Sequence, residues 1–253
     1  MHLYVIAGAG LSAESNLPTF RTGPNATWAG HDLDKVCTHS TFRANFALVH
    51  QFYNERRAKL AAPDVEPNAA HRMIVAWQRR YETSVITTNV DDLLERAGCA
   101  DVLHLHGSLR RMRCEPKGPG AARVATGCGH VWEIGYAPFH AGRDACPACG
   151  STVDPKPDVT FFEEYSPAYA DFERLRKRSR LGDAYVVIGM SGAVLLAGRS
   201  VDHVINRLSG LKILNNLEPS PYLDHTVFKH RFFEPATTAA GRIDTLLRQH
   251  FGR

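Results

Sequence analysis

The chain has 253 residues, of which 44% are hydrophobic and 22% charged, which is typical of a globular protein with one large domain or one domain and a small insert. Its net charge of +4 suits an anionic cofactor or an acidic substrate, but no basic run is interleaved with aromatic residues, so we expect no specific nucleic-acid partner. No apolar run reaches the roughly 18 residues that span a membrane and no secretory signal is visible, so we expect a cytoplasmic protein with no membrane partner.

Strand and helix patterns alternate along most of the chain. Short apolar or β-branched stretches predict strands at residues 5–6, 84–89, 102–107, 184–191 and 211–219. Apolar periodicity and end signals predict helices at residues 41–60, 67–77, 91–98, 167–180, 199–208 and 240–250. Strands separated by helices predict an α/β fold, namely a Rossmann-like parallel sheet with helices on both faces.

One stretch, residues 110–155, breaks this alternation, because it is rich in Gly, Pro, Arg and Cys and has no clear period. We therefore expect a discontinuous Rossmann-like domain at residues 1–109 and 156–253, with a helical insert at about 40–80. The stretch 110–155 would form a small separate module.

The segment VIAGAGLSAES contains a dinucleotide signature. A strand leads directly into Gly8, Ala9 and Gly10, in the pattern G-x-G-x-x-G/A that lets a pyrophosphate approach backbone N–H groups at a helix N-terminus. Pro18 follows eight residues after Gly10, and a proline inside a helix costs about 3 kcal/mol. The first helix must therefore be short, which disfavours a dehydrogenase.

The predicted strands end in polar or glycine-rich tips, at residues 8–10, 88–91, 106–107, 189–191 and 215–218. The carboxyl ends of parallel strands meet at one edge of a sheet, where α/β proteins bind ligands, so the tips predict one site. Taken alone, His106 is more often a hydrogen-bonded structural histidine, Asn89 a turn residue and Asp91 a helix N-cap. Their convergence favours function.

Four of the six cysteines lie between Cys114 and Cys149, and without an export signal such clustering favours a metal over disulfides. Cys146 and Cys149 form a metal knuckle, and Cys114 with Cys128 completes a closed, structural zinc set that leaves no position for catalysis. Thirteen residues separate Cys114 from Cys128 where the usual knuckle has two, so His130 is an alternative ligand. A module without metal is the other alternative.

Six short motifs follow one another along the chain: GAGLSAESNLPTFR, TTNVDDLLERAG, HG, PDVTFFEE, GMS and NLEP, with the cysteine module between the third and the fourth. They resemble, in the same order, the motifs GAGxSAESGIPxFR, TQN(I/V)DxLHxRAG, HG, PxVVWFGE, GTS and NLEP of the sirtuins, which are NAD-dependent protein-lysine deacylases. The resemblance covers nearly the whole chain.

The resemblance implies roles for individual residues. Gly8, Ala9 and Gly10 would hold the NAD pyrophosphate, and His106, with Asn89 beside it, would be catalytic. The other residues implied to bind NAD are Ser12, Glu14, Phe20, Arg21, Thr88, Asp91, Gly189, Ser191, Asn216, Leu217, Glu218 and Ala236. Phe20 and Arg21 would shield the nicotinamide ribose in a mobile loop, which would explain why the first helix stops early.

The resemblance also implies a reaction on acyl-lysine protein substrates. In this family the acyl oxygen attacks the ribose carbon as nicotinamide leaves, and a ribose hydroxyl deprotonated by the histidine then attacks the imidate. The products are nicotinamide, O-acyl-ADP-ribose and free lysine. A histidine, with an ordinary pKa of about 6.5, suits this at neutral pH. The substrate would add as a strand beside Thr160, Phe161 and Phe162, opposite a segment near residues 192–194.

Two residues, Tyr53 and Arg56, indicate which acyl groups the protein accepts. They fall three residues apart on the apolar stripe of one predicted helix, where an arginine requires a carboxylate or access to solvent. They also match the Tyr-x-x-Arg pair of bacterial sirtuins that act on succinyl- and malonyl-lysine, which implies a contact with the acyl carboxylate. The alternative is that Arg56 reaches a surface ion pair and that Arg57 is the solvent-facing partner.

The chain departs from the family at several positions. Thr88 replaces a glutamine that contacts the ribose, Glu163 replaces a glycine of the substrate segment, and the remaining departures are Asn16, Leu94, Met190 and Thr160. Thr88 and Glu163 keep open an NAD glycohydrolase or an ADP-ribosyltransferase on the same fold. A non-catalytic NAD sensor is disfavoured, because such a protein would not need His106.

Overall fold

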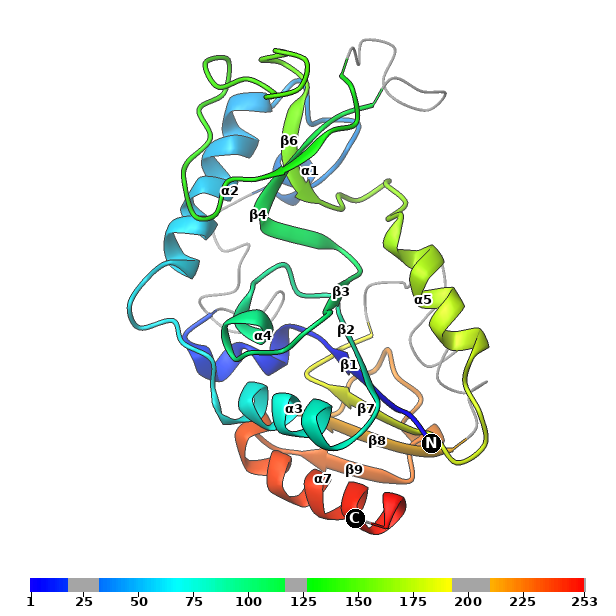
Figure 1. Cartoon of the computed structure of the whole chain (residues 1–253). Coiled ribbons are helices and arrows are strands. Elements are labelled where there is room, and N and C mark those ends of the chain that lie inside the picture. The colour runs from blue at the N-terminus through cyan, green and yellow to red at the C-terminus, as the bar shows by residue number, and fades with distance from the viewer. Residues whose placement is uncertain (18–31, 117–126, 193–209, 253) are drawn as a thin grey trace.

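The structure, a computed structural model, describes residues 1–17, 32–116, 127–192 and 210–252. Figure 1 shows a large lobe built on a parallel sheet and a small lobe built around helix α2 and a short antiparallel sheet. Among the described segments, no helix combines the length and the apolar character that a membrane-spanning helix requires.

The large lobe contains six parallel strands in the order β3-β2-β1-β7-β8-β9. They are β1 (Leu3–Ala7), β2 (Thr83–Thr87), β3 (Leu103–His104), β7 (Ala184–Ile188), β8 (Leu211–Asn216) and β9 (His230–Phe233). The order reverses between β1 and β7, because β2 and β3 are added on one side of β1 and the later strands on the other. Such a reversal opens a crevice at the carboxyl ends of the strands, where α/β proteins bind ligands.

Both faces of this sheet are covered by helices. The helices are α3 (Ala69–Arg80), α4 (Leu93–Arg96), α5 (Ala168–Lys177) and α7 (Ala236–Phe251). Leu3 and Val5 of β1 pack in a core with α3 and α7, whereas Tyr4 and Ile6 pack in a second core with α5. This alternation is what a strand buried on both faces requires. The predicted fold class is confirmed.

The small lobe joins a helix to an antiparallel sheet of order β5-β4-β6. Its elements are α1 (Leu33–Val36), α2 (Phe46–Leu60), β4 (Gly107–Cys114), β5 (Val131–Glu133) and β6 (Pro155–Val159). Residues of α2 and the neighbouring segments form a third core with Leu109 and Phe161. The sheet therefore extends from Gly107 to Val159, around the stretch that the sequence assigned to a separate module.

Most predicted elements occur with shorter bounds, but four strands were missed. They are β9 and the three strands of the small sheet. Pro155 and Pro157 count against a strand, and β6 tolerates them because it lies at the edge of its sheet. The early stop after β1 is present as two short 3-10 helices, η1 (Ala9–Leu11) and η2 (Ala13–Ser15), and a third, η3 (His225–Val227), precedes β9. The predicted helix at 199–208 lies outside the described residues.

Candidate active site

The glycine loop follows β1 at the point where the strand order reverses. The N–H of Gly8 donates to the carbonyl of Ile188, and the N–H of Gly10 donates to that of Gly189, each at 2.9 Å. A Cβ on Gly8 would lie 2.6 Å from the Gly189 carbonyl oxygen, and a Cβ on Gly189 would lie 2.2 Å from the backbone nitrogen of Leu11. Glycine is therefore required for the packing of the β1 loop against the β7 loop.

Polar side chains gather beside this loop. The side-chain amide of Asn89 donates to the Gly8 carbonyl (3.1 Å) and to the Ser12 hydroxyl (3.2 Å), and that hydroxyl donates to the Asp91 carboxylate (3.0 Å). Asp91 also accepts a hydrogen bond from the N–H of Leu93, but the N-cap of α4 is Asp92, one residue later than the expected cap. Burial raises the pKa of Asp91. Three residues from two motifs far apart in the sequence are thus brought together by one network.

His106 lies next to this network, half-buried at the start of the small sheet. Burial lowers its pKa to about 4, and a hydrogen bond to the backbone of Thr88 opposes that shift. The N–H of Thr88 donates to the carbonyl of Ala7, the last residue of β1, at 3.0 Å. The Nε2 atom of His106 lies 3.1 Å from the hydroxyl of Tyr169. At neutral pH the imidazole is uncharged, which is the state a general base requires.

His104 is a residue that the sequence interpretation missed. Its Nδ1 lies 3.0 Å from the backbone carbonyl of Asn89, and its Nε2 lies 2.6 Å from the carboxylate of Glu95. Burial lowers the pKa of His104, but the hydrogen bond and charge of Glu95 outweigh it, so the pKa is raised. His104 precedes His106 by two residues, and in an extended segment such residues share a face. That spacing was the signal that could have found it.

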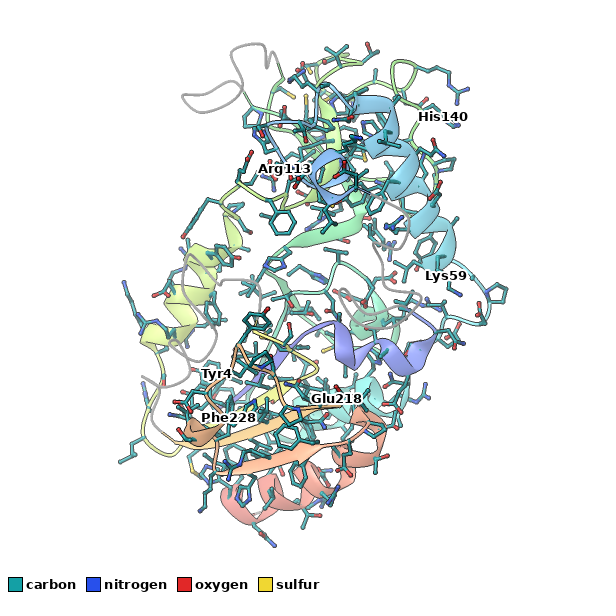
Figure 2. The ribbon with its side chains drawn as sticks, turned by 180° about the vertical axis from the view of Figure 1, so that it is seen from behind. Tyr4, Lys59, Arg113, His140, Glu218 and Phe228 are labelled. Atoms are coloured by element: carbon teal, nitrogen blue, oxygen red, sulfur yellow. The ribbon has the colours of Figure 1, made fainter. Side chains whose placement is uncertain are left out.

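The residues expected to hold the adenosine half of NAD follow β8 and begin α7. Asn216 is buried, and its side-chain amide donates to the Met190 carbonyl at 2.9 Å. Leu217 and Glu218 are exposed, and Glu218 is labelled in the large lobe in Figure 2. Ala236, the first residue of α7, is buried in the core that α7 shares with α3. Their contact with adenosine stays a prediction.

Two further predicted cofactor residues have structural partners. The Ser191 carbonyl accepts a hydrogen bond of 2.5 Å from the Ser220 hydroxyl. The Glu14 carboxylate accepts hydrogen bonds from the backbone N–H (3.0 Å) and the hydroxyl (2.6 Å) of Thr237, which ties η2 to the first turn of α7. Phe20, Arg21 and residues 193–194 lie outside the described residues.

The predicted substrate segment adjoins the base directly. The N–H of Thr160 donates to the carbonyl of His106 at 2.9 Å. Phe161 is buried, whereas Phe162 is partly exposed and its N–H donates to the carbonyl of Cys37 at 2.8 Å. The segment is thus held between the base on one side and the small lobe on the other.

Two departures from the family's glycines occupy glycine-like backbone positions. Glu163 has φ +72° and Asn16 has φ +59°. The Glu163 carboxylate accepts a hydrogen bond from the N–H of Ser40 at 2.9 Å, and the hydrogen bonds from the Ser40 side chain and backbone lower the pKa of Glu163. The Asn16 amide donates to the Asp64 carbonyl at 2.8 Å. Asparagine tolerates this conformation well, whereas glutamate rarely adopts it. Each side chain therefore ties its loop to the small lobe.

Tyr53 and Arg56 lie on α2 beside the substrate segment. Tyr53 is buried, its ring stacks on Phe161 with centroids 5.7 Å apart, and its hydroxyl lies 3.1 Å from the sulfur of Cys37. The Arg56 guanidinium lies over the ring of Phe52, donates to the Phe52 carbonyl at 3.0 Å, and has 19% of its side chain exposed. Burial lowers the pKa of Arg56 to about 10.

Arg57 differs from its expected place. The alternative interpretation put its side chain in solvent, and that part is wrong, because Arg57 is fully buried. Its guanidinium donates to the Leu109 carbonyl (2.6 Å), to the Asn54 side chain (2.9 Å) and to the sulfur of Met112 (3.1 Å). Arg57 lies four residues after Tyr53 on the buried side of α2, and its guanidinium reaches Leu109 and Met112 of β4 instead of solvent.

The four cysteines form one cluster at the far end of the small lobe. Their sulfur atoms all lie within 4.8 Å of one another, and the Cys114–Cys149 and Cys128–Cys146 pairs are each 3.7 Å apart. Zinc–sulfur bonds of about 2.3 Å in a tetrahedron place the sulfurs about 3.8 Å apart, so the cluster fits a structural zinc ion. His130 is not part of the cluster, and its ring stacks on Trp132.

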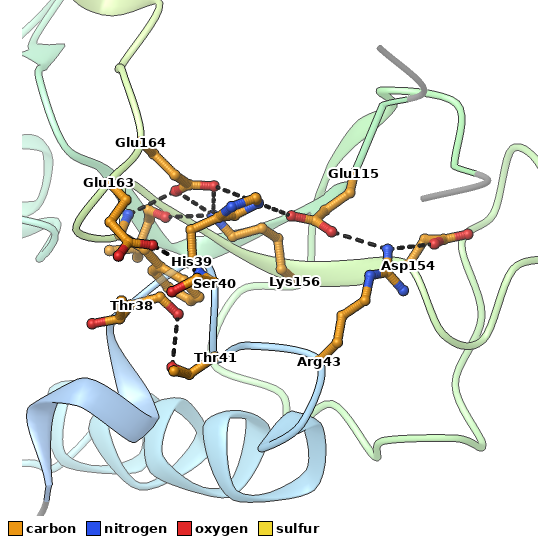
Figure 3. A network of polar contacts seen from close by, with 12 residues as sticks. Thr38, His39, Ser40, Thr41, Arg43, Glu115, Asp154, Lys156, Glu163 and Glu164 are labelled. Carbon is orange, nitrogen blue, oxygen red and sulfur yellow. Dashed lines mark hydrogen bonds and ion pairs between the residues drawn. The ribbon is translucent and has the colours of Figure 1, made fainter. Parts of the chain in front are cut away.

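A chain of ion pairs, drawn in Figure 3, runs from Glu115, which is next to the cysteine cluster in the sequence, to Glu164, which is next to the substrate segment. Glu115, which directly follows a cysteine of the cluster, contacts His39 (2.7 Å) and Arg43 (3.0 Å). Lys156 is buried and contacts Glu164 at 2.6 Å, which in turn lies 3.7 Å from His39. These carboxylates are already neutralised by cationic side chains. We therefore interpret the group as an ion-pair network that joins the two regions.

Comparison with known proteins bears on this arrangement. The model of the Sir2 family matches residues 8–195, which include the glycine loop, His106, the cysteine cluster and the substrate segment. The NAD-dependent protein deacylase of Helicobacter hepaticus is 36% identical over 98% of both chains, and that of Campylobacter jejuni is 40% identical over 78% of this chain and 77% of its own.

Solved structures agree with this match. A Sir2 homologue in complex with NAD has a TM-score of 0.80 at 28% identity, over 98% of this chain and 90% of that one. A Sir2 homologue in complex with ADP-ribose has a TM-score of 0.80 at 28% identity, over 99% of this chain and 93% of that one. Because the family model matches well over half of the chain and its relatives align along most of it, the chain belongs to the Sir2 family.

Proposed function

We propose that this protein is an NAD-dependent protein-lysine deacylase that transfers the acyl group to ADP-ribose. The observation that carries the proposal is the position of His106. The His106 ring is hydrogen-bonded to the backbone of Thr88, and the N–H of Thr88 donates to Ala7 at the end of β1. The backbone carbonyl of His106 accepts a hydrogen bond from Thr160. One histidine thus stands between the glycine loop and the segment that would bind the acyl-lysine. The names of the curated relatives support the same activity.

Each group would act on a defined atom. NAD would supply the ribose carbon to which the acyl oxygen is transferred, with nicotinamide as the leaving group. The neutral His106 takes the proton of a ribose hydroxyl at Nε2, while its other ring nitrogen is held by the Thr88 backbone. Asn89 is fixed by Gly8 and Ser12, so it would meet the nicotinamide ribose in a preorganised position. The site must exclude water, because otherwise NAD is only hydrolysed.

The same proposal extends to acidic acyl groups such as succinyl. The Arg56 guanidinium is partly desolvated, which its lowered pKa reflects. It belongs to the same helix as Tyr53, whose ring stacks on Phe161 of the substrate segment. A carboxylate at the end of the acyl chain would restore the solvation that burial removes, through a charge-assisted hydrogen bond. An acetyl group has no such carboxylate and would gain nothing from Arg56.

Mass spectrometry of one mixture tests the activity. Purified protein is incubated with NAD and equal amounts of acetyl-lysine and succinyl-lysine peptides, alongside the His106→Ala variant. We expect free lysine peptide and O-acyl-ADP-ribose from the wild type and neither from the variant. Nicotinamide and ADP-ribose with both peptides untouched would instead establish an NAD glycohydrolase, and peptides that gain ADP-ribose would establish an ADP-ribosyltransferase.

The Arg56→Met variant tests the acyl preference. A hydrogen bond to a charged group contributes about 1.5–3 kcal/mol, so kcat/KM on the succinyl peptide should fall roughly 10- to 150-fold while that on the acetyl peptide changes little. Lys59→Met is the matched control, because Lys59 lies on the same helix but is exposed and paired with Asp64. Equal loss on both peptides in Arg56→Met would show that Arg56 has a structural role only.

We also propose a reducing, cytoplasmic location. The six cysteines are free thiols, and four of them are arranged for a metal rather than for disulfides. A redox-sensitive thiolate cluster of this kind persists where thiols stay reduced.

A further inference from the structure

Tyr169 meets the catalytic base from the opposite side of the site. It is the second residue of α5, it is 5% exposed, and its hydroxyl lies 3.1 Å from Nε2 of His106. The two rings stand edge to face, with centroids 6.3 Å apart and an interplanar angle of 85°. The hydroxyl is thus within hydrogen-bond distance of Nε2, the nitrogen that carries the lone pair when the neutral ring is protonated at Nδ1.

The residue at position 88 does not provide this contact. The Thr88 hydroxyl donates to the Ala7 carbonyl at 3.3 Å, so its side chain is directed to β1. Only the backbone of Thr88 reaches His106, and it bonds a ring nitrogen as an acceptor, which favours protonation. Since Nε2 faces Tyr169, that nitrogen is Nδ1. The two partners together specify the tautomer with the proton on Nδ1.

We propose that Tyr169 is the positioning residue of His106: its hydroxyl donates to the single lone pair of Nε2 in the free enzyme, gives that lone pair up to the ribose hydroxyl when the substrates bind, and accepts from Nε2 once the base has taken the ribose proton. The inference rests on the proposed deacylase function. In this step the O–H bond of the ribose hydroxyl breaks and an N–H bond forms at Nε2, while Tyr169 keeps its own proton. A hydroxyl can make this exchange because it is both donor and acceptor.

Burial of Tyr169 gives the hydroxyl a second, simpler reason to have a partner, because buried tyrosine hydroxyls are usually hydrogen-bonded. The two roles differ in the reaction step that they affect. Nicotinamide leaves before the base acts, so exchange of labelled nicotinamide into NAD, in the presence of acyl peptide, reports the first step alone. Formation of free lysine peptide requires the base as well.

The experiment compares both rates in the Tyr169→Phe variant. Phenylalanine keeps the ring that packs in the core beside α5, so the fold should be retained, and thermal unfolding checks this. We expect deacylation at saturating NAD and peptide to fall about two- to tenfold, as the loss of one hydrogen bond implies, with nicotinamide exchange unchanged. Tyr165→Phe is the matched control, because Tyr165 touches the Tyr169 ring but is 66% exposed. Its two rates should equal those of the wild type.

Three results would overturn the inference. One is an unchanged ratio of the two rates in Tyr169→Phe, whether both persist or both fall. Another is a fall in nicotinamide exchange when Tyr169→Phe is added to His106→Ala, because a residue that acts through the base has no effect without it. The third uses the unaltered chain: nitrogen NMR shifts of His106 should report the tautomer protonated at Nδ1, and the opposite tautomer would contradict the proposed contacts. A wild type without deacylation would refute the proposed function itself.

Discussion

The packing of the glycine loop against the β7 loop predicts a graded series of stability losses. In Gly189→Ala the new Cβ would lie 2.2 Å from a backbone nitrogen, which no side-chain rotation relieves, and φ is +64°. Overpacking costs about 1–3 kcal/mol and the left-handed conformation about 1–2 kcal/mol, so the free energy of unfolding should fall by about 2–5 kcal/mol. Gly8→Ala has an extended backbone and a clash at 2.6 Å, so only the overpacking cost of about 1–3 kcal/mol applies.

Urea unfolding of three variants measures this series. Gly241→Ala is the control, because it lies inside α7 with nothing within 4 Å of its Cβ, and it should stabilise the protein by about 0.5–1 kcal/mol. If Gly189→Ala unfolds within about 0.5 kcal/mol of the wild type, the loops can move apart, and the packing argument fails.

Two further predictions concern pH and zinc. Burial lowers the pKa of His50 to about 4, so the unfolded chain binds a proton below pH 6.5 that the folded chain refuses. Stability should therefore fall as the pH drops from 6.5 towards 4, by up to about 1.4 kcal/mol per pH unit for this group. Urea titrations at several pH values should show a smaller slope of the unfolding free energy against pH for His50→Gln than for the wild type. An identical slope would show that His50 takes no part. The wild type should hold one zinc ion per chain by elemental analysis. Cys146→Ser should bind zinc far less tightly and lose deacylation. Full zinc retention in Cys146→Ser would mean that the four sulfurs are not the ligands.

The sheet and the convergence of its tips could be predicted because they depend on local patterns. Burial on both faces and the parallel order bring Gly8, Asn89 and His106 to one edge whatever the side-chain details are. The reason why the glycine loop requires glycine could not be predicted from local patterns alone. The pattern favoured approach of a pyrophosphate, but the structure shows that a β7 loop far along the chain also requires them, and only tertiary contacts reveal that.

The departures from the family motifs show the same limit. Leu94 and Met190 are buried in the two cores of the large lobe, where their apolar side chains are needed for packing. The contact between Tyr169 and His106 joins residues 63 positions apart, and no spacing rule connects them. Sequence patterns report which side chains share an element, whereas partners from different elements depend on how the elements pack.

Asn16 and Glu163 together have a mechanical consequence. Their hydrogen bonds reach Asp64 and Ser40, which lie just after and just before α2, so both ends of this helix are tethered. A hinge motion that swings α2 away from the glycine loop or from the substrate segment must break one of these bonds, at about 0.5–1.5 kcal/mol each. The open arrangement is thereby depopulated about two- to tenfold per tether. A chain with glycine at both positions would be free to open more often, and would release its products with fewer restraints.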